Sequence, residues 1–482
     1  MRLLIRNGTV VTAEGRRAAD VLVGGETIVQ VAPGIAATAD RIVDATDRLV
    51  IPGGVDVHTH LDMPYGDAVS ADDFASGTMA AALGGTTTIV DFAVQDRGGT
   101  LHAAVETWQA KARGKAAVDF GFHVIVTDVT PTVLREMDTL VTEGITSFKL
   151  FMAYPGRLMV DDATIFRTLL ATAKNGGMVM MHAENGGVIE VLQERALAAG
   201  HTEPMQHALT RPPLVEAEAA HRAIALADMA GAPLYIVHVS AAETVDEIAA
   251  ARARGLPVYG ETCPQYLFLT DDAYKEDGAR FIMSPPLRDR RAQERLWQGL
   301  LKGDLQTVAT DHCPFTLAEK HRHAEFTRVP GGAAGIETRM ALLFDARRLP
   351  LERFVAVTAT EPARLFGLYP RKGALAIGSD ADIVIFDPKK RWVLRPDQMH
   401  TTAKWTLYEG MEMTGGVETT IVRGRTIHHE AKIVGEKGYG AFIRPNLLEP
   451  NALFPVKIYN GFAEGDPLSS DSIVANRLFS RF

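Results

Sequence analysis

From Pro52 onward, strand-like runs alternate with helix-like segments, and this alternation restricts the possible folds more than any other feature of the chain. Eight short apolar runs have the length of buried strands, at residues 55–60, 86–92, 120–126, 146–154, 178–184, 233–240, 257–262 and 306–311. Helical periodicity lies between them, for example at 161–174, 215–229, 241–251 and 291–301. Such βαβ units form parallel sheets, and eight of them predict an α/β fold of the (β/α)8 TIM barrel type. A doubly wound open sheet is the alternative.

The segments on either side of this region have an all-β pattern. Short β-branched runs separated by turns occupy residues 3–12, 19–33, 41–51, 378–388 and 418–425. We therefore expect residues 1–51 and 372–437 to join into one small β-sandwich beside a catalytic barrel of residues 52–371. Residues 438–482 have several Pro and Asn and weak periodicity, which predicts a C-terminal arm that docks on a neighbouring subunit or stays mobile.

Composition excludes several classes of protein. The formal net charge of −9 disfavours binding to nucleic acid and to anionic membranes. No signal-peptide hydrophobic region and no apolar run of membrane-spanning length is present in the sequence. Two cysteines, Cys263 and Cys313, cannot make a disulfide framework. We expect a soluble cytoplasmic protein with neither nucleic-acid nor membrane partners.

Histidines close several of the predicted strands. His58 and His60 are alternate residues of one strand, so their rings point to the same side, which suits a metal ion. A hydrogen-bonded histidine pair at a strand end is the alternative. His182 and His238 each end a further apolar run, and packing alone does not readily explain the repetition.

An acid and a lysine complete the pattern. Asp311 ends the last predicted strand, where it is either the N-cap of the next helix or a metal ligand and general base. Lys149 lies within the apolar run SFKLFM, where burial would lower the pKa of its amine. It could extend to solvent. Alternatively, the neutral amine could react with carbon dioxide to form a carbamate, whose two oxygens could bridge two cations.

All six residues lie at or near the carboxyl ends of predicted strands, which is the face where α/β barrels place catalytic groups. The set consists of His58, His60, Lys149, His182, His238 and Asp311. Four imidazoles, one acid and one potential carbamate suit two divalent ions of borderline softness, for which zinc is the expectation.

The ordered motifs VDVHTHLDMP, GGTTTIVDF, SFKLFMAY, HAENG, VHVS, YGETCPQYL, MSPPLR, ATDHCPF and FGLYPRKG span nearly the whole chain. With them the chain resembles the cyclic amidohydrolases, specifically the dihydropyrimidinases and D-hydantoinases. The resemblance implies a barrel with a small β-sandwich, two zinc ions, and a homotetramer or homodimer. It implies that the six residues above are the metal ligands, with Lys149 carboxylated, and that Tyr154 polarises the substrate carbonyl. Main-chain groups at Ser284 and Gly331 would hold the amide edge of the ring.

Two positions depart from related patterns. Family members usually have Pro-Asn-Gly where this chain has Pro330-Gly331-Gly332. If the main chain reads the ring, glycine can replace asparagine, although the loop gains freedom. Relatives that hydrolyse dihydroorotate carry an arginine two residues after the HxH pair. Asp62 occupies this position here, and its charge would repel a substrate carboxylate.

The resemblance predicts hydrolysis of a cyclic ureide by a hydroxide that bridges the two metals. A metal and Tyr154 would stabilise the oxyanion, and Asp311 would carry a proton to the leaving ring nitrogen. The products would be N-carbamoyl amino acids, from dihydropyrimidines or 5-substituted hydantoins. Met63, Tyr65 and Phe151 are expected to contact the exocyclic group, with Val94 a further candidate and ordinary packing the alternative.

Other residues and functions stay open at this point. We expect Cys263 and Cys313 to be structural, and His123 to be either structural or a support for the metal site. An allantoinase-like hydrolase of another cyclic ureide is the alternative enzyme. A non-enzymatic scaffold like the collapsin-response proteins is disfavoured, because those proteins have lost metal ligands whereas this chain keeps all six positions and Tyr154.

Overall fold

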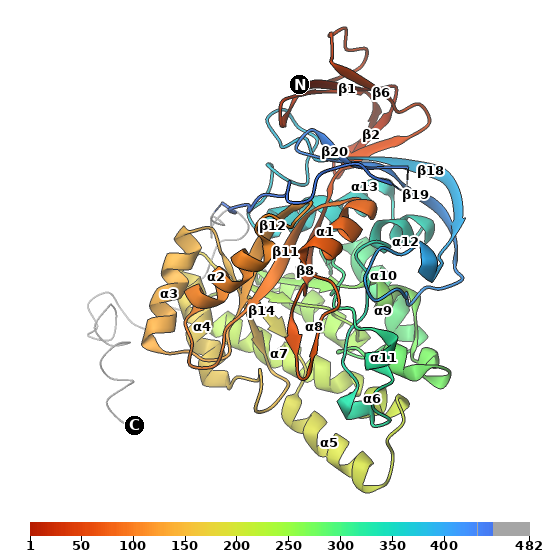
Figure 1. The fold of residues 1–482 in the computed structure, drawn as a ribbon. Coiled ribbons are helices and arrows are strands. Elements are labelled where there is room, and N and C mark those ends of the chain that lie inside the picture. The colour runs from red at the N-terminus through yellow and green to blue at the C-terminus, as the bar shows by residue number, and fades with distance from the viewer. Residues whose placement is uncertain (431, 447–482) are drawn as a thin grey trace, which may run out of the picture.

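The computed structural model describes residues 1–430 and 432–446, and its centre is a parallel β-barrel (Figure 1). The eight strands are β8 (Gly54–Thr59), β11 (Thr86–Val94), β12 (Asp119–Ile125), β13 (Ser147–Phe151), β14 (Met178–His182), β15 (Leu234–Ile236), β16 (Val258–Thr262) and β17 (Thr307–Val308). Each pairs with the next in chain order. A parallel bridge between Thr59 and His312 links the last strand to the first, with His60 N 2.9 Å from His312 O. The barrel prediction is confirmed, and the open doubly wound sheet is not observed.

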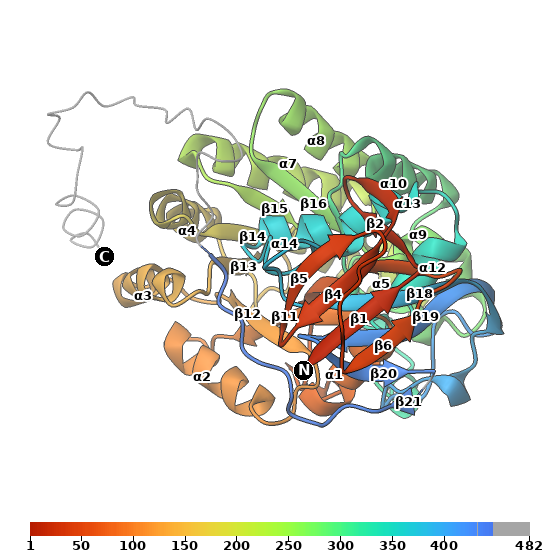
Figure 2. The ribbon, with the colours of Figure 1, turned by 90° about the horizontal axis from the view of Figure 1, so that it is seen from above.

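Helices surround this barrel (Figure 2). They are α1 (Phe74–Leu83), α2 (Leu101–Ala112), α3 (Pro131–Thr142), α4 (Asp162–Asn175), α5 (Gly186–Ala198), α6 (Met205–Leu209), α7 (Pro213–Ala230), α8 (Ala242–Ala253), α9 (Pro264–Phe268), α10 (Arg290–Lys302), α11 (Leu317–Lys320), α12 (Arg339–Asp345), α13 (Leu351–Val355) and α14 (Glu361–Leu365). The four helices expected from periodicity correspond to α4, α7, α8 and α10.

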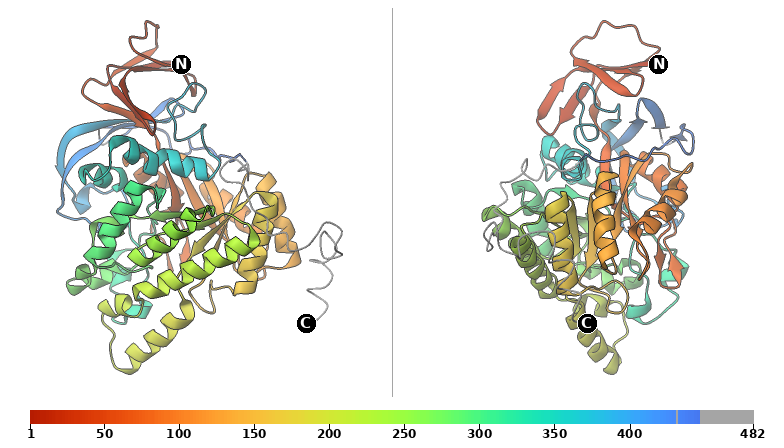
Figure 3. Two further views of the ribbon diagram at one scale, coloured as in Figure 1. Left: turned by 180° about the vertical axis from the view of Figure 1, so that it is seen from behind. Right: turned by 90° about the vertical axis from the view of Figure 1, so that its left-hand side faces the viewer.

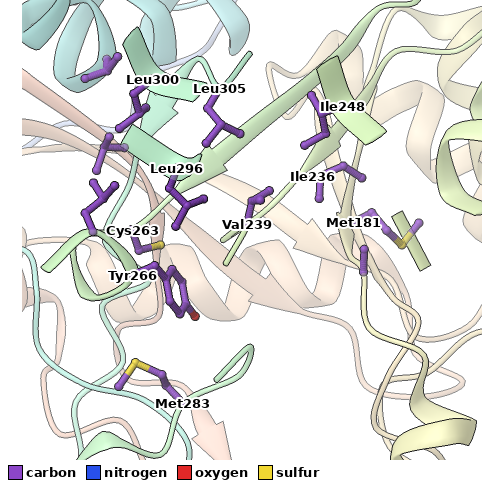
Figure 4. Packing of buried hydrophobic residues seen from close by; sticks show 14 of the residues in the cluster. Met181, Ile236, Val239, Ile248, Cys263, Tyr266, Met283, Leu296, Leu300 and Leu305 are labelled. Carbon is purple, nitrogen blue, oxygen red and sulfur yellow. The ribbon is translucent and has the colours of Figure 1, made fainter. Parts of the chain in front are cut away.

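Helix α10 illustrates how the sequence sets such an element. Asp289 caps its first turn by accepting a hydrogen bond from Ala292 N, and Gly303 ends it in the left-handed conformation, with φ of 85°. Leu296 and Leu300 lie one turn apart and are fully buried. Figure 4 shows them packed beside Leu305 in the core between the helices and the strands.

The β-sandwich is made from both ends of the described chain. A four-stranded sheet contains β1 (Arg2–Arg6), β4 (Asp20–Gly24), β5 (Thr27–Ala32) and β6 (Arg41–Asp44). A seven-stranded sheet contains β2 (Thr9–Thr12), β3 (Gly15–Ala18), β7 (Leu49–Pro52), β18 (Ile383–Val393), β19 (Glu412–Val422), β20 (Arg425–His429) and β21 (Lys432–Ile433). Antiparallel pairing of β7 with β18 joins the two chain segments. Both views of Figure 3 place the sandwich at one end of the molecule and α5 at the other.

The described start of the C-terminal arm packs on its own barrel. Phe120 N lies 3.0 Å from Ala441 O and Ile443 N lies 2.8 Å from Phe120 O, so this segment runs beside β12. Residues 447–482, most of the predicted arm, lie outside the described residues. Within the part of the chain that the structure covers, no helix combines the length and apolarity needed to cross a membrane.

Candidate active site

The barrel brings the six predicted ligand positions together at the carboxyl ends of five strands. They are His58 (β8), His60 (after β8), Lys149 (β13), His182 (β14), His238 (after β15) and Asp311 (after β17). His58 Nε2 lies 2.9 Å from Lys149 Nζ and 3.2 Å from Asp311 Oδ1. His60 Nε2 lies 3.1 Å from the same oxygen. Ligand atoms of His58, His60 and Asp311 all fall within 4.8 Å of one another, which is compact enough for one cation.

The remaining two histidines form a second group beside the first. His182 Nδ1 lies 2.9 Å from His238 Nε2. The rings of His238 and His58 are 5.4 Å apart, so the two groups are neighbours. Except for Asp311, whose side chain is 14% exposed, the six residues are almost completely buried.

Two buried glutamates orient one histidine of each group. The carboxylate of Glu261 accepts a hydrogen bond from His58 Nδ1, and Glu184 Oε2 lies 2.9 Å from His182 Nε2. When the outward ring nitrogen donates its proton to a carboxylate, the inward nitrogen presents a lone pair. The inward nitrogens of His58 and His182 are the ones that face the other predicted ligands. Imidazole lone pairs and a carboxylate suit a zinc-like cation, so these residues fit the metal site that the family resemblance implies.

Neither glutamate was predicted from the sequence. Glu184 follows His182 by two residues in HAENG, and Glu261 lies inside the seventh predicted strand, where an acid needs partners. Tyr235 donates to Glu261 Oε2 at 2.9 Å and His238 N to Oε1 at 3.1 Å. Burial raises the pKa of Glu261 to about 8, although the hydrogen bond from Tyr235 lowers it. A cation bound to His58 would lower this pKa and favour the ionised carboxylate.

Lys149 does not extend to solvent. Its side chain is fully buried, with Nζ 4.3 Å from the centre of the Phe92 ring. Burial lowers the pKa of the amine to about 8, although the negative charge of Asp311 raises it. A neutral amine at this position is the form that could react with carbon dioxide.

Asp311 does not cap a helix. The next helix, α11, is capped by Thr316, so the N-cap alternative is wrong. Burial opposes ionisation of Asp311, but His58 and His60 outweigh it and hold the pKa of this carboxyl well below its usual range.

One cavity of about 60 Å³ adjoins the cluster. It is lined by His60, Met63, Tyr65, Lys149, Phe151, Tyr154, Leu158, His182, His238, Met283, Ser284, Asp311, Cys313, Gly331 and Gly332. The wall therefore contains six of the predicted substrate residues, namely Met63, Tyr65, Phe151, Tyr154, Ser284 and Gly331. The further candidate Val94 and the predicted ligand His58 are not among the lining residues, and Leu158, Met283, Cys313 and Gly332 line the cavity without having been predicted to contact substrate.

Two tyrosines line this cavity. Tyr154 lies on the cavity wall with Ser284, and burial raises the pKa of Tyr154 well above its usual value, so the phenol stays protonated and able to donate. Tyr65 lines the same cavity beside Gly331, and burial raises the pKa of its hydroxyl, so this phenol is protonated as well.

Three residues of the site have a left-handed backbone. The φ angles are 66° at Tyr154, 40° at His238 and 51° at Asp311. Non-glycine residues rarely adopt this conformation, and such strain concentrates at functional sites because the surrounding structure holds it in place.

The other singled-out residues do not supply a nucleophile. His123 is fully buried and its Nε2 lies 3.0 Å from Val57 O; burial lowers the pKa of its ring to about 3, so it is neutral. Cys263 packs in the core beside Tyr266 and Leu296 (Figure 4). Cys313 lines the cavity, but burial raises the pKa of its thiol far above neutrality, so it stays protonated.

Comparison with known proteins agrees with this geometry. Residues 49–427 match the model of the amidohydrolase family. A D-hydantoinase of Streptomyces coelicolor is 50% identical over 454 residues, covering 92% of this chain and 97% of that protein. A D-hydantoinase of Geobacillus stearothermophilus is 46% identical, covering 92% and 96%. The crystal structure of a dihydropyrimidinase from Brevibacillus agri NCHU1002 superposes with a TM-score of 0.92 at 46% identity, covering 93% of this chain and 99% of that one. The chain therefore belongs to the amidohydrolase family, in the group that contains D-hydantoinases and dihydropyrimidinases, and is an enzyme of the cyclic amidohydrolase class.

Proposed function

We propose that this enzyme hydrolyses the ring amide bond of dihydropyrimidines and 5-substituted hydantoins to give N-carbamoyl amino acids. One observation carries the proposal: a single cavity is lined by five of the six proposed ligands, by Tyr154, and by the segments of Ser284 and Gly331. The names of the related proteins, D-hydantoinase and dihydropyrimidinase, point to the same two rings.

The six clustered residues would hold two divalent cations, for which we propose zinc. His58, His60 and Asp311 would form one side of the centre, and His182 and His238 the other. Lys149, as its carbamate, would place one oxygen toward each group. When bound, such ions supply a hydroxide nucleophile at neutral pH and polarise a carbonyl.

The protein groups would then guide the atoms of the reaction. Water adds to the ring carbonyl carbon, and Asp311 takes its proton. The protonated Tyr154 hydroxyl donates a hydrogen bond to the carbonyl oxygen as negative charge develops there. Asp311 returns the proton to the ring nitrogen as the carbon–nitrogen bond breaks, so that a carboxylate and a carbamoylated amine result.

The remaining cavity wall would select the ring and its substituent. Main-chain groups of Ser284 and Gly331 would hold the polar amide edge. Met63, Tyr65 and Phe151 lie on the same wall, with Leu158 as a fourth member, and would contact the 5-substituent. An apolar wall of this kind favours substituted hydantoins with apolar side chains.

The test is ring opening of dihydrouracil and of a series of 5-substituted hydantoins by zinc-loaded protein, with the N-carbamoyl product measured by chromatography. Turnover of either class supports the proposal, and the ratio of kcat/KM values identifies the preferred ring. Absence of turnover with two metal ions bound per chain would refute it, and turnover of allantoin alone would assign the alternative ureide. Binding of substantially fewer than two ions, with no turnover, would indicate a scaffold protein.

A further inference from the structure

Two buried side chains lie directly behind the main chain of Ser284 and Gly331. Lys320, in α11, is completely buried, and its Nζ lies 2.7 Å from Ile282 O and 2.8 Å from Pro330 O. His207, in α6, is 4% exposed, and its Nε2 lies 2.7 Å from Met283 O. Neither residue lines the cavity.

The carbonyls that these side chains contact belong to particular peptide units. Met283 O is in the same peptide group as the Ser284 N–H, and Pro330 O is in the same group as the Gly331 N–H. A donor on the carbonyl oxygen polarises the peptide and strengthens its N–H as a hydrogen-bond donor. Each buried side chain therefore acts on a main-chain donor at the cavity edge.

Both side chains are donors in the states that the structure indicates. Arg211 Nη1 lies 3.0 Å from His207 Nδ1, and because arginine only donates, Nδ1 accepts and Nε2 carries the proton. Burial lowers the pKa of His207 well below its usual value, so the ring stays neutral with this tautomer. Lys320 donates whether its amine is charged or neutral.

Lys320 also joins the two segments to each other. Its ammonium contacts Ile282 on one segment and Pro330 on the other, and Gly332 N donates to the same Ile282 oxygen at 3.1 Å. In the described part of the chain no carboxylate forms an ion pair with this lysine, so burying its amine is costly. The hydrogen bonds to the two carbonyl oxygens offset part of this cost. Gly331 itself lines the cavity, so this peptide can be reached from it.

We propose that Lys320 and His207 are positioning residues that hold the Met283–Ser284 and Pro330–Gly331 peptides in register and strengthen their N–H donors toward the substrate's amide edge. The inference rests on the proposed function, because it requires the ring to bind at these two peptides. The acceptors it implies on the substrate are the carbonyl oxygens of a cyclic ureide.

A matched pair of lysine variants tests the first residue. Lys320→Met removes the donor and keeps the length of the side chain. Lys372→Met removes a different buried lysine, one paired with Asp119 and Asp382 and absent from the cavity wall. We expect Lys320→Met to raise KM about tenfold or more with kcat changed less than about threefold, because binding common to the ground and transition states is lost. Lys372→Met should lower stability and leave KM unchanged. A fall in kcat with unchanged KM in Lys320→Met, at normal metal content, would overturn the assignment.

His207 allows a substitution that conserves the donor. The amide nitrogen of His207→Gln can occupy the place of Nε2 and donate to Met283 O, whereas His207→Phe keeps the ring shape without a donor. We expect the phenylalanine variant to raise KM and the glutamine variant to restore most of the loss. Equal KM values in the two variants would overturn the role of the His207 hydrogen bond.

Hydrogen exchange measured by mass spectrometry separates failure of this inference from failure of the proposed function. Peptides covering residues 279–287 and 326–335 should exchange faster in Lys320→Met than in wild type, and should be unchanged in Lys372→Met. Unchanged exchange in Lys320→Met would overturn the positioning role even in an active enzyme. If wild-type protein opened no ureide, the proposed function would fail, and faster exchange would still establish that Lys320 holds the two segments.

Discussion

Glu261→Gln is the substitution that most directly tests how the candidate metal centre is oriented. Glu261 accepts hydrogen bonds from His58 Nδ1, from the Tyr235 hydroxyl at 2.9 Å and from His238 N at 3.1 Å. Glutamine has nearly the same shape, but one of its two terminal atoms is an amide nitrogen that donates hydrogen bonds. That nitrogen cannot accept the hydrogen bond that the replaced carboxylate oxygen accepted. His58 would then lose the partner that keeps its Nε2 lone pair directed at the cluster.

The size of the effect follows from the bond that is lost. A hydrogen bond to a charged group contributes about 1.5–3 kcal/mol. At about 1.4 kcal/mol per tenfold change, this loss corresponds to metal affinity weakened about 10- to 150-fold. The first group, with His58, His60 and Asp311, should lose its ion before the second group, because Glu184 still orients His182.

The assay is metal content by mass spectrometry after equilibration with a graded series of chelator concentrations. Asp119→Asn is the matched control, since Asp119 is an equally buried carboxylate that pairs with Lys372 and Arg423 away from the cavity. The control should lower the melting temperature and retain wild-type metal affinity. Metal affinity within about threefold of wild type in Glu261→Gln would refute the orienting role.

The remaining predictions concern other parts of the same site. Lys149→Ala should abolish metal retention and activity together, with partial rescue by a short carboxylic acid; full activity in this variant would exclude the carbamate. Gly331→Asn should fold normally, because a Cβ there would meet its nearest atoms at 3.6 and 3.7 Å. Gly332→Asn should lose several kcal/mol of stability, because φ at this residue is 142° and a Cβ would lie 2.3 Å from Cys313 O. Similar melting temperatures of the two variants would contradict this contrast. Burial lowers the pKa of Lys320 to about 7, so between about pH 7 and about pH 10 the unfolded state binds more protons than the folded state. The contribution of Lys320 to the free energy of unfolding therefore rises with pH over this range. Cys313 beside it stays protonated across this range. The difference in stability between Lys320→Met and wild type should therefore move in favour of wild type as pH rises. A pH-independent difference in melting temperature would contradict the assignment.

Much of the fold could be predicted because its signals are local. Short apolar runs of strand length and helices with capping residues, such as Asp289 at α10, are set by neighbouring residues. The six candidate ligands could be placed together for a related reason. Each lies at or near the carboxyl end of a parallel strand, and in a closed barrel all carboxyl ends meet on one face. Position along the strand therefore determines position in space.

The rest depends on contacts between distant segments, which no local pattern reveals. Glu261 and His58 are 203 residues apart. From the sequence alone, an acid in a buried strand could pair with any buried polar group, and only the fold places Glu261 behind His58. The tolerance for a side chain at Gly331 but not at Gly332 follows from the atoms that surround each Cα.

The sequence by itself determined the order of strands, the barrel and the residue types available at its carboxyl end, because periodicity and chain order are enough to specify them. The tertiary structure alone decided which nitrogen of His58 faces inward and which peptide groups Lys320 and His207 hold. A hydrogen bond forms only when donor and acceptor are placed to within a few tenths of an ångström, and between segments far apart in the chain only the packed molecule sets that placement.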